Sequence, residues 1–127
     1  LKATPIGTVL GEALSGLGLG IFLPFIIAAA IKSAQGSSTV SLITTSALVF
    51  PLLPQLGLDS EMARVLVVMA IGGGSLTVSH ANDSFFWVFT QYSKMDVATG
   101  YKTHTVHTAI LGCTAMAVAF LLSLILV

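Results

Sequence analysis

The chain has 127 residues, of which 55% are hydrophobic and 8% are charged, and its formal net charge is zero. Soluble domains carry roughly 25% charged residues, so this composition excludes a protein whose whole surface faces water. The balanced charge also excludes nucleic acid as a partner, because that role needs a basic surface. Uncharged apolar stretches of about 18 residues or more instead predict an all-α membrane protein in the lipid bilayer.

The first predicted element is a helical hairpin over residues 8–53. Its first arm is apolar as far as Ile31 and contains Pro24, which would bend a helix. The second arm, residues 40–53, would measure about 21 Å as a helix, which is less than the hydrocarbon core of about 30 Å. We therefore predict a re-entrant hairpin, whose arms enter the membrane from one side and whose polar tip, residues 33–39, stops inside it.

The second predicted element is a helix over residues 61–92 that is broken in its middle. As one straight helix it would measure about 48 Å, which is too long for the membrane. Its centre is rich in glycine, serine and asparagine, which weaken helices or favour caps and turns. We therefore predict two half-helices, at about 61–72 and 83–92, joined by an unwound segment at residues 73–82.

The last predicted element is a transmembrane helix over residues 104–127, which follows an interfacial loop at residues 93–103. This loop holds Lys94 and Lys102, whereas the loop at residues 54–60 has no lysine or arginine. The positive-inside rule therefore predicts that residues 93–103 face the cytoplasm.

Ionisable residues near the ends of the apolar stretches are interpreted as interfacial. They are Glu12, Lys32, His104 and His107. Lys32 would extend its ammonium group towards water along the membrane surface. The two histidines have a spacing that suits metal binding, but the sequence places no third ligand nearby, so we predict no metal site.

The two predicted breaks are the candidate sites for function. Non-helical backbone at membrane depth is tolerated where protein shields it or where it lines a wet cavity. In transporters, the N-termini of half-helices bind anionic substrates. The candidate substrate-binding residues are Gln35, Gly36, Ser37, Ser38, Thr39, Ser79, His80 and Asn82.

Asp83 and His80 are candidates for carrying a proton, because ionisable residues inside membrane segments are functional candidates by default. As alternatives, Asp83 could serve only as a helix cap, and His80 could be a structural histidine.

Two stretches of the sequence resemble the C-terminal signatures of the gluconate permease family of proton symporters. They are residues 34–40 and residues 73–84, the latter followed by Phe86 and Trp87. The resemblance implies proton-coupled uptake of gluconate or a related sugar acid by a multi-pass protein of the bacterial inner membrane. A proton gradient would drive transport, without any cofactor.

The resemblance also implies the plan of the ion transporter superfamily, with two inverted halves that each contain a re-entrant hairpin and a broken helix. Residues 1–127 would be the C-terminal transmembrane part, most of the second half. Its partners would be the small carboxylate substrate, the lipid bilayer and the N-terminal half of the same transporter, and a homo-oligomer is left open.

Other functional classes were weighed against this one. An intramembrane enzyme is disfavoured because Ser79 and His80 are adjacent and cannot easily face each other as nucleophile and base, and because no nucleophile-elbow motif is found. We therefore expect no enzymatic activity. A channel or a purely structural protein is disfavoured by the two breaks. A symporter for another small carboxylate, such as a hydroxy acid or an amino acid, stays open.

Overall fold

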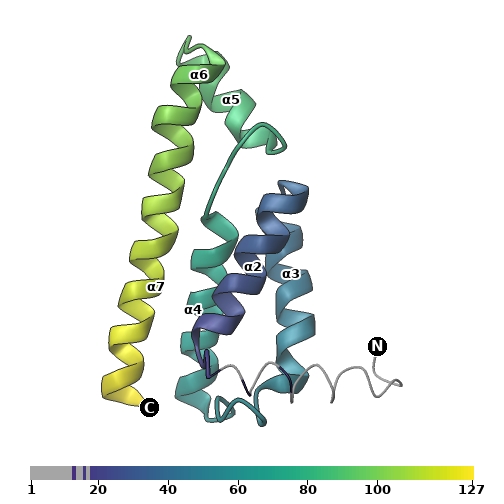
Figure 1. The fold of residues 1–127 in the computed structure, drawn as a ribbon, viewed down its shortest axis with the longest axis vertical. Helices are drawn as coiled ribbons and strands as arrows, with labels where there is room; N and C mark the ends of the chain where they lie inside the picture. The colour runs from purple at the N-terminus through teal and green to yellow at the C-terminus, as the bar shows by residue number, and fades with distance from the viewer. Residues whose placement is uncertain (1–12, 14–15, 17) are drawn as a thin grey trace.

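The computed structural model describes residues 13, 16 and 18–127, and in this part of the chain the regular structure is entirely helical (Figure 1). The all-α prediction is therefore confirmed for the described residues, while Glu12 and the predicted start of the hairpin lie outside them. The elements are α2 (Phe22–Gln35), α3 (Ser38–Val49), η1 (Phe50–Leu52), α4 (Glu61–Leu76), α5 (Ser84–Tyr92), α6 (Val97–Gly100), η2 (Tyr101–Thr105) and α7 (Val106–Leu126).

α2 and α3 form an antiparallel pair joined by a very short turn. Gly36 ends α2 in the left-handed conformation (φ 81°), and its N–H donates to the Lys32 carbonyl over 2.8 Å. Ser37 then caps α3, because its hydroxyl accepts from the Val40 N–H over 3.3 Å. Both helices thus continue up to the turn, and the tip is confined to Gly36 and Ser37 instead of the predicted residues 33–39.

Pro24 does not bend the middle of a helix as expected. It lies in the first turn of α2, where a missing N–H leaves no helical hydrogen bond unmade. The backbone geometry of α2 therefore tolerates this proline without a kink.

α4 and α5 are separated by a non-helical link, residues 77–83, which is drawn as a thin tube in Figure 1. α4 begins at the Ser60 cap, whose hydroxyl accepts from the Ala63 N–H over 3.2 Å, and it continues to Leu76. The predicted unwound segment, residues 73–82, is therefore wrong at its start, because its glycines are helical.

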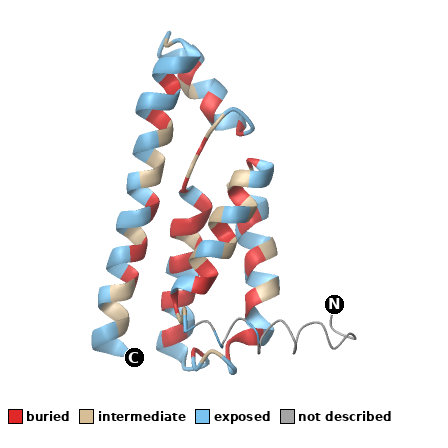
Figure 2. Ribbon diagram, in the orientation of Figure 1, coloured by how far each residue is buried: buried red, intermediate tan, exposed pale blue. Residues whose placement is uncertain are grey.

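The glycines of α4 allow close helix packing instead of unwinding. A Cβ atom on Gly74 would lie 2.4 Å from the Phe25 carbonyl oxygen of α2. A Cβ atom on Gly73 would lie 3.1 Å from the Gly112 carbonyl oxygen of α7. The absence of side chains thus brings α2 and α7 against two sides of α4, where Figure 2 shows many buried residues.

α6, η2 and α7 form one helical run, Val97–Leu126, and within the described part of the chain it is the one run long and apolar enough to cross a membrane. It starts earlier than the predicted residue 104, so the predicted loop at 93–103 is wrong in its second half. Asp96 starts the run, because its carboxylate accepts from the Thr99 N–H over 2.9 Å. The π-helical segment η2 widens the helix by one residue at Tyr101–Thr105.

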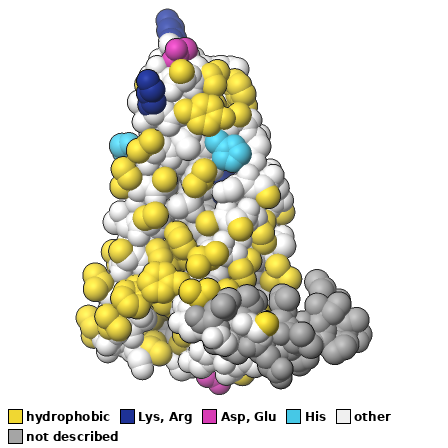
Figure 3. Space-filling model, in the orientation of Figure 1, with side chains coloured by type: hydrophobic (Ala, Val, Ile, Leu, Met, Phe, Trp, Pro, Cys, Tyr) yellow, Lys and Arg dark blue, Asp and Glu magenta, His cyan; other side chains and the backbone are white. Residues whose placement is uncertain are grey.

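The outer surface of this bundle is strongly apolar. Large side chains are exposed on several helices, for example Ile43 of α3, Val68 of α4, and Ile110 and Leu124 of α7. Figure 3 shows basic and acidic side chains at the α6 end and an acidic side chain at the opposite end, with many hydrophobic side chains between them. An apolar band of this extent is suited to lipid or to further protein and not to water.

Candidate functional site

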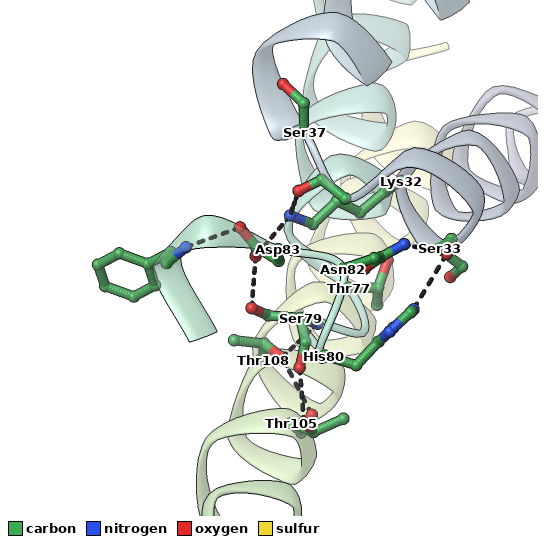
Figure 4. Close-up of polar contacts among 12 residues, drawn as sticks. Lys32, Ser33, Ser37, Thr77, Ser79, His80, Asn82, Asp83, Thr105 and Thr108 are labelled. Carbon is green, nitrogen blue, oxygen red and sulfur yellow. Dashed lines mark hydrogen bonds and ion pairs between the residues drawn. The ribbon is translucent and has the colours of Figure 1, made fainter. Parts of the chain in front are cut away.

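The hairpin tip and the link between α4 and α5 lie against each other (Figure 4). A Cβ atom on Gly36 would lie only 2.1 Å from the Asn82 backbone oxygen, so the two segments are in direct contact. The Asn82 side-chain amide donates to the Ser33 carbonyl over 2.8 Å, and the His80 Nε2 atom lies 3.0 Å from the same oxygen. These contacts fasten the C-terminal end of α2 to the link.

A buried ion pair lies at this junction. The Lys32 ammonium donates to Asp83 Oδ2 over 2.7 Å and to the Gly36 carbonyl over 2.6 Å. Lys32 is 1% exposed and Asp83 is 8% exposed. The interfacial interpretation of Lys32 is therefore wrong: the end of α2 packs against the link, and Asp83 supplies the charge that a buried ammonium requires.

The Asp83 carboxylate has two further donors. Its Oδ1 atom accepts from the Phe85 N–H over 3.0 Å and thereby caps α5. Its Oδ2 atom also accepts from the Ser79 hydroxyl over 2.5 Å. Asp83 is thus the N-cap of α5, and the cap is only one of the contacts that its side chain makes.

His104 extends the buried polar cluster towards the last helix. Its Nε2 atom lies 3.0 Å from the Ser79 hydroxyl oxygen, and its ring stacks on Phe89 with a centroid distance of 4.5 Å. A hydroxyl has one proton, so while Ser79 donates to an ionised Asp83, the Nε2 of His104 must be the donor to Ser79. His104 is 6% exposed and is thus buried among protein side chains, whereas His107 is exposed.

The backbone of the link is held by α7 and η2. The Ser79 N–H donates to the Thr108 hydroxyl over 3.1 Å, and the Thr105 hydroxyl donates to the Ser79 carbonyl over 2.6 Å. The Trp87 ring N–H donates to the Ala81 carbonyl over 2.8 Å. Side chains thus replace part of the helical hydrogen bonding that the link lacks, which is what buried non-helical backbone requires.

The remaining predicted residues lie at the open side of the tip. Gln35 and Thr39 are exposed, and Ser37 and Ser38 are half-buried at the N-terminal end of α3. The predicted substrate-binding residues therefore form two groups, one at the hairpin tip and one in the link. The tip residues border the site, whereas Ser79, His80 and Asn82 are engaged in contacts within it.

The sequence interpretation missed Lys32 and His104 as members of the cluster. A signal for Lys32 was present, because an intramembrane aspartate usually pairs with a cation, and the chain has only five lysines and arginines. His104 gave no comparable signal, since its approach to Ser79 depends on the packing of η2 against the link.

Comparisons with known proteins identify relatives of this chain. A family profile described as GntP family permease matches residues 1–125. The low-affinity gluconate transporter of Escherichia coli (strain K12) is 42% identical over 108 residues, which cover 84% of this chain and 24% of that protein. The gluconate permease of Pseudomonas aeruginosa is 39% identical over 127 residues, covering 99% of this chain and 28% of the relative.

A third relative is named for a different substrate. The D-serine transporter DsdX of Escherichia coli (strain K12) is 32% identical over 127 residues, covering 99% of this chain and 28% of the relative. The chain thus spans about a quarter of the length of these curated relatives. No solved structure matches it. With a family match over nearly its whole length, the chain belongs to the GntP permease family.

Proposed function

We propose that the protein containing this chain is a secondary transporter that takes up gluconate or another small carboxylate together with protons across a bacterial inner membrane. Membership of a permease family and a helical run of membrane-spanning length support a membrane location. The observation that carries the proposal is the buried Lys32–Asp83 pair at the meeting point of two helix interruptions. Charged groups inside membrane segments are costly and mark transport sites.

In this proposal α2 and α3 are the arms of a re-entrant hairpin within residues 8–53. α3 has 12 residues, and its length of about 18 Å is too short for the hydrocarbon core. Figure 1 supports this arrangement, because the tip ends beside the link and does not extend to the α6 end. The broken helix and the helical run ending in α7 would each cross the membrane, with residues 93–103 on the cytoplasmic side.

The substrate carboxylate would bind at the tip, next to the start of α3. Gluconate and D-serine, the substrates for which the relatives are named, share a carboxylate beside a carbon that carries a hydroxyl or an amino group. The N-terminus of a helix attracts such an anion through its backbone N–H groups and dipole. Gln35, Gly36, Ser37, Ser38 and Thr39 would surround the carboxylate, while Ser79, His80 and Asn82 would complete the site from the link.

An enzyme is not supported by the arrangement of the cluster. Ser79 and His104 approach each other as a nucleophile and a base would, but the Asp83 carboxylate binds the Ser79 hydroxyl, whereas in a catalytic triad it would orient the histidine. The relatives described above are named as transporters or permeases.

Uptake into proteoliposomes tests the transport function. The full-length protein should accumulate radiolabelled gluconate or D-serine when the exterior is more acidic than the interior, and a protonophore should abolish this accumulation. Asp83→Asn should abolish accumulation against a gradient but retain exchange of labelled for unlabelled substrate, because it removes the proposed proton site and keeps a polar side chain of the same size. The proposal would be contradicted if neither substrate were accumulated, or if accumulation did not depend on the proton gradient.

Ser38→Ala tests binding at the tip. The Ser38 hydroxyl lies in the first turn of α3, so its loss should raise the apparent KM for the carboxylate about tenfold, as expected for a lost hydrogen bond to a charged group. Ser46→Ala, an exposed serine near the other end of α3, is the matched control and should leave KM unchanged. Equal KM values for the two variants would exclude Ser38 from the site.

A further inference from the structure

The Lys32 ammonium group lies between the Asp83 carboxylate and the proposed binding site of the substrate carboxylate. This group has three donors, of which one binds Asp83 and another binds the Gly36 carbonyl. Gly36 immediately precedes Ser37 and the first turn of α3, where the substrate carboxylate is proposed to bind. The cation therefore lies between the aspartate on one side and the candidate anion site on the other (Figure 4).

Asp83 is the acidic side chain that balances this cation. The other acidic residues of the described part of the chain, Asp59, Glu61 and Asp96, are exposed, whereas Asp83 is buried. The ionisable groups facing the pair from the surrounding elements are His104 of η2, which reaches Asp83 through Ser79, and His80 of the link, which contacts Ser33. His107, one turn beyond His104, is exposed.

A lysine is suited to exchange one partner for another. Its ammonium is a compact point charge on a flexible stem with rotatable donors, so it can turn from one oxygen to a neighbouring one without a fixed bidentate geometry. The tip residues Ser37 and Ser38 are half-exposed, whereas Lys32 is covered. A substrate anion would therefore reach the tip first and draw the ammonium group away from Asp83.

We propose that Lys32 is the shared counter-ion of Asp83 and the substrate carboxylate, and that a proton on Asp83 releases Lys32 to bind the substrate. This inference rests on the proposed transport function. Without substrate, the Lys32 cation pairs with the Asp83 anion. With substrate, the cation pairs with the substrate anion, and the added proton neutralises the Asp83 carboxylate.

The buried site is electrically neutral in both states. Binding of the anion without a proton would leave two carboxylates on one ammonium, and binding of a proton without the anion would leave a lone buried cation. Each of these states carries a net charge in a poorly solvated place, which is costly. The proton and the anion are thus bound together, and this thermodynamic coupling is what symport requires.

The pH dependence of binding is the first measurement. For the purified full-length protein, the Kd for radiolabelled gluconate or D-serine should rise with pH by up to about tenfold per unit once Asp83 is ionised, because one proton accompanies each anion. In Asp83→Asn the Kd should not depend on pH over this range, and at alkaline pH the variant should bind more tightly than the unmodified protein.

A neutral double variant isolates the role of Lys32. Lys32→Gln combined with Asp83→Asn contains no unpaired buried charge, so it should fold, which elution in size-exclusion chromatography would check. We expect it to bind the same ligand about 10- to 100-fold more weakly than Asp83→Asn alone, since the ammonium–carboxylate contact is lost. Lys102→Gln, which removes an exposed lysine, should leave Kd unchanged.

The outcomes distinguish the shared counter-ion from the proposed transport function. If the unmodified protein neither binds nor accumulates gluconate or D-serine, the proposed function is wrong, and this inference fails with it. If transport is normal but the double variant binds as tightly as Asp83→Asn, then Lys32 is a structural partner of Asp83 only. A Kd that is independent of pH in the unmodified, transporting protein would likewise overturn the shared counter-ion.

Discussion

Replacing Gly36 with alanine is expected to abolish transport and to lower the free energy of unfolding by about 2–5 kcal/mol. Two effects add. The residue has a φ of 81°, which costs an L-residue about 1–2 kcal/mol. A Cβ atom would also lie 2.1 Å from the Asn82 backbone oxygen and 2.6 Å from its carbonyl carbon. Because these are backbone atoms, the hairpin tip and the link would have to separate.

Gly57→Ala is the matched control for Gly36→Ala. Gly57 also has a positive φ, 68°, but no heavy atom lies within 4 Å of the added Cβ position. The Gly57→Ala variant should lose only about 1–2 kcal/mol of free energy of unfolding, from the unfavourable backbone conformation, and should retain transport. Thermal unfolding of the purified full-length variants and uptake into proteoliposomes provide the comparison. If both variants lost stability and transport to the same extent, the contact between tip and link would not be needed.

Removing one member of the Lys32–Asp83 pair should destabilise the protein by about 3–5 kcal/mol, because the other charge is left buried without a partner. Lys32→Gln and Asp83→Asn are the single variants. When they are combined, both charges are removed, so the double variant should be less destabilised than the sum of the single effects by about 2 kcal/mol or more. Unfolding of the four proteins in detergent measures this coupling.

The exposed residues Glu61 and Arg64, which are three positions apart on α4, provide the control cycle. Water screens such a pair, so the coupling between Glu61→Gln and Arg64→Gln should be within about 0.5 kcal/mol of zero. A coupling between Lys32 and Asp83 that is equally small would mean that the buried contact contributes no more than a surface pair.

Several features of the fold could be predicted because they depend on local sequence. Segment lengths and apolar stretches predicted a helical protein, and capping serines such as Ser60 mark where helices begin. The glycines near residue 73 were misinterpreted, because a glycine in a helix is equally compatible with unwinding and with close packing. The choice between them depends on Phe25 and Gly112, which belong to other helices.

The polar cluster could be predicted only in part, because its contacts join residues of different helices. The sequence identified Ser79 and Asp83 as members of an unusual polar segment. The small number of lysines and arginines was a signal that pointed towards Lys32 as the partner of Asp83, but Lys32 is 51 positions away and lies at an ordinary helix end, so no local pattern links the two residues. His104 likewise joins the cluster through the packing of η2 against the link, which leaves no local pattern.

The two carboxylate oxygens of Asp83 have different partners, and this division has a consequence for the stability of α5. Oδ1 accepts from the Phe85 N–H at the start of that helix, whereas Oδ2 faces Lys32 and Ser79. A proton that binds Oδ2 changes the charge of the side chain but leaves the oxygen that holds the first turn in place. In the proposed cycle, protonation of Oδ2 would therefore leave the hydrogen bond that caps α5 in place, so that Asp83 could change its charge repeatedly without unwinding the helix that it starts.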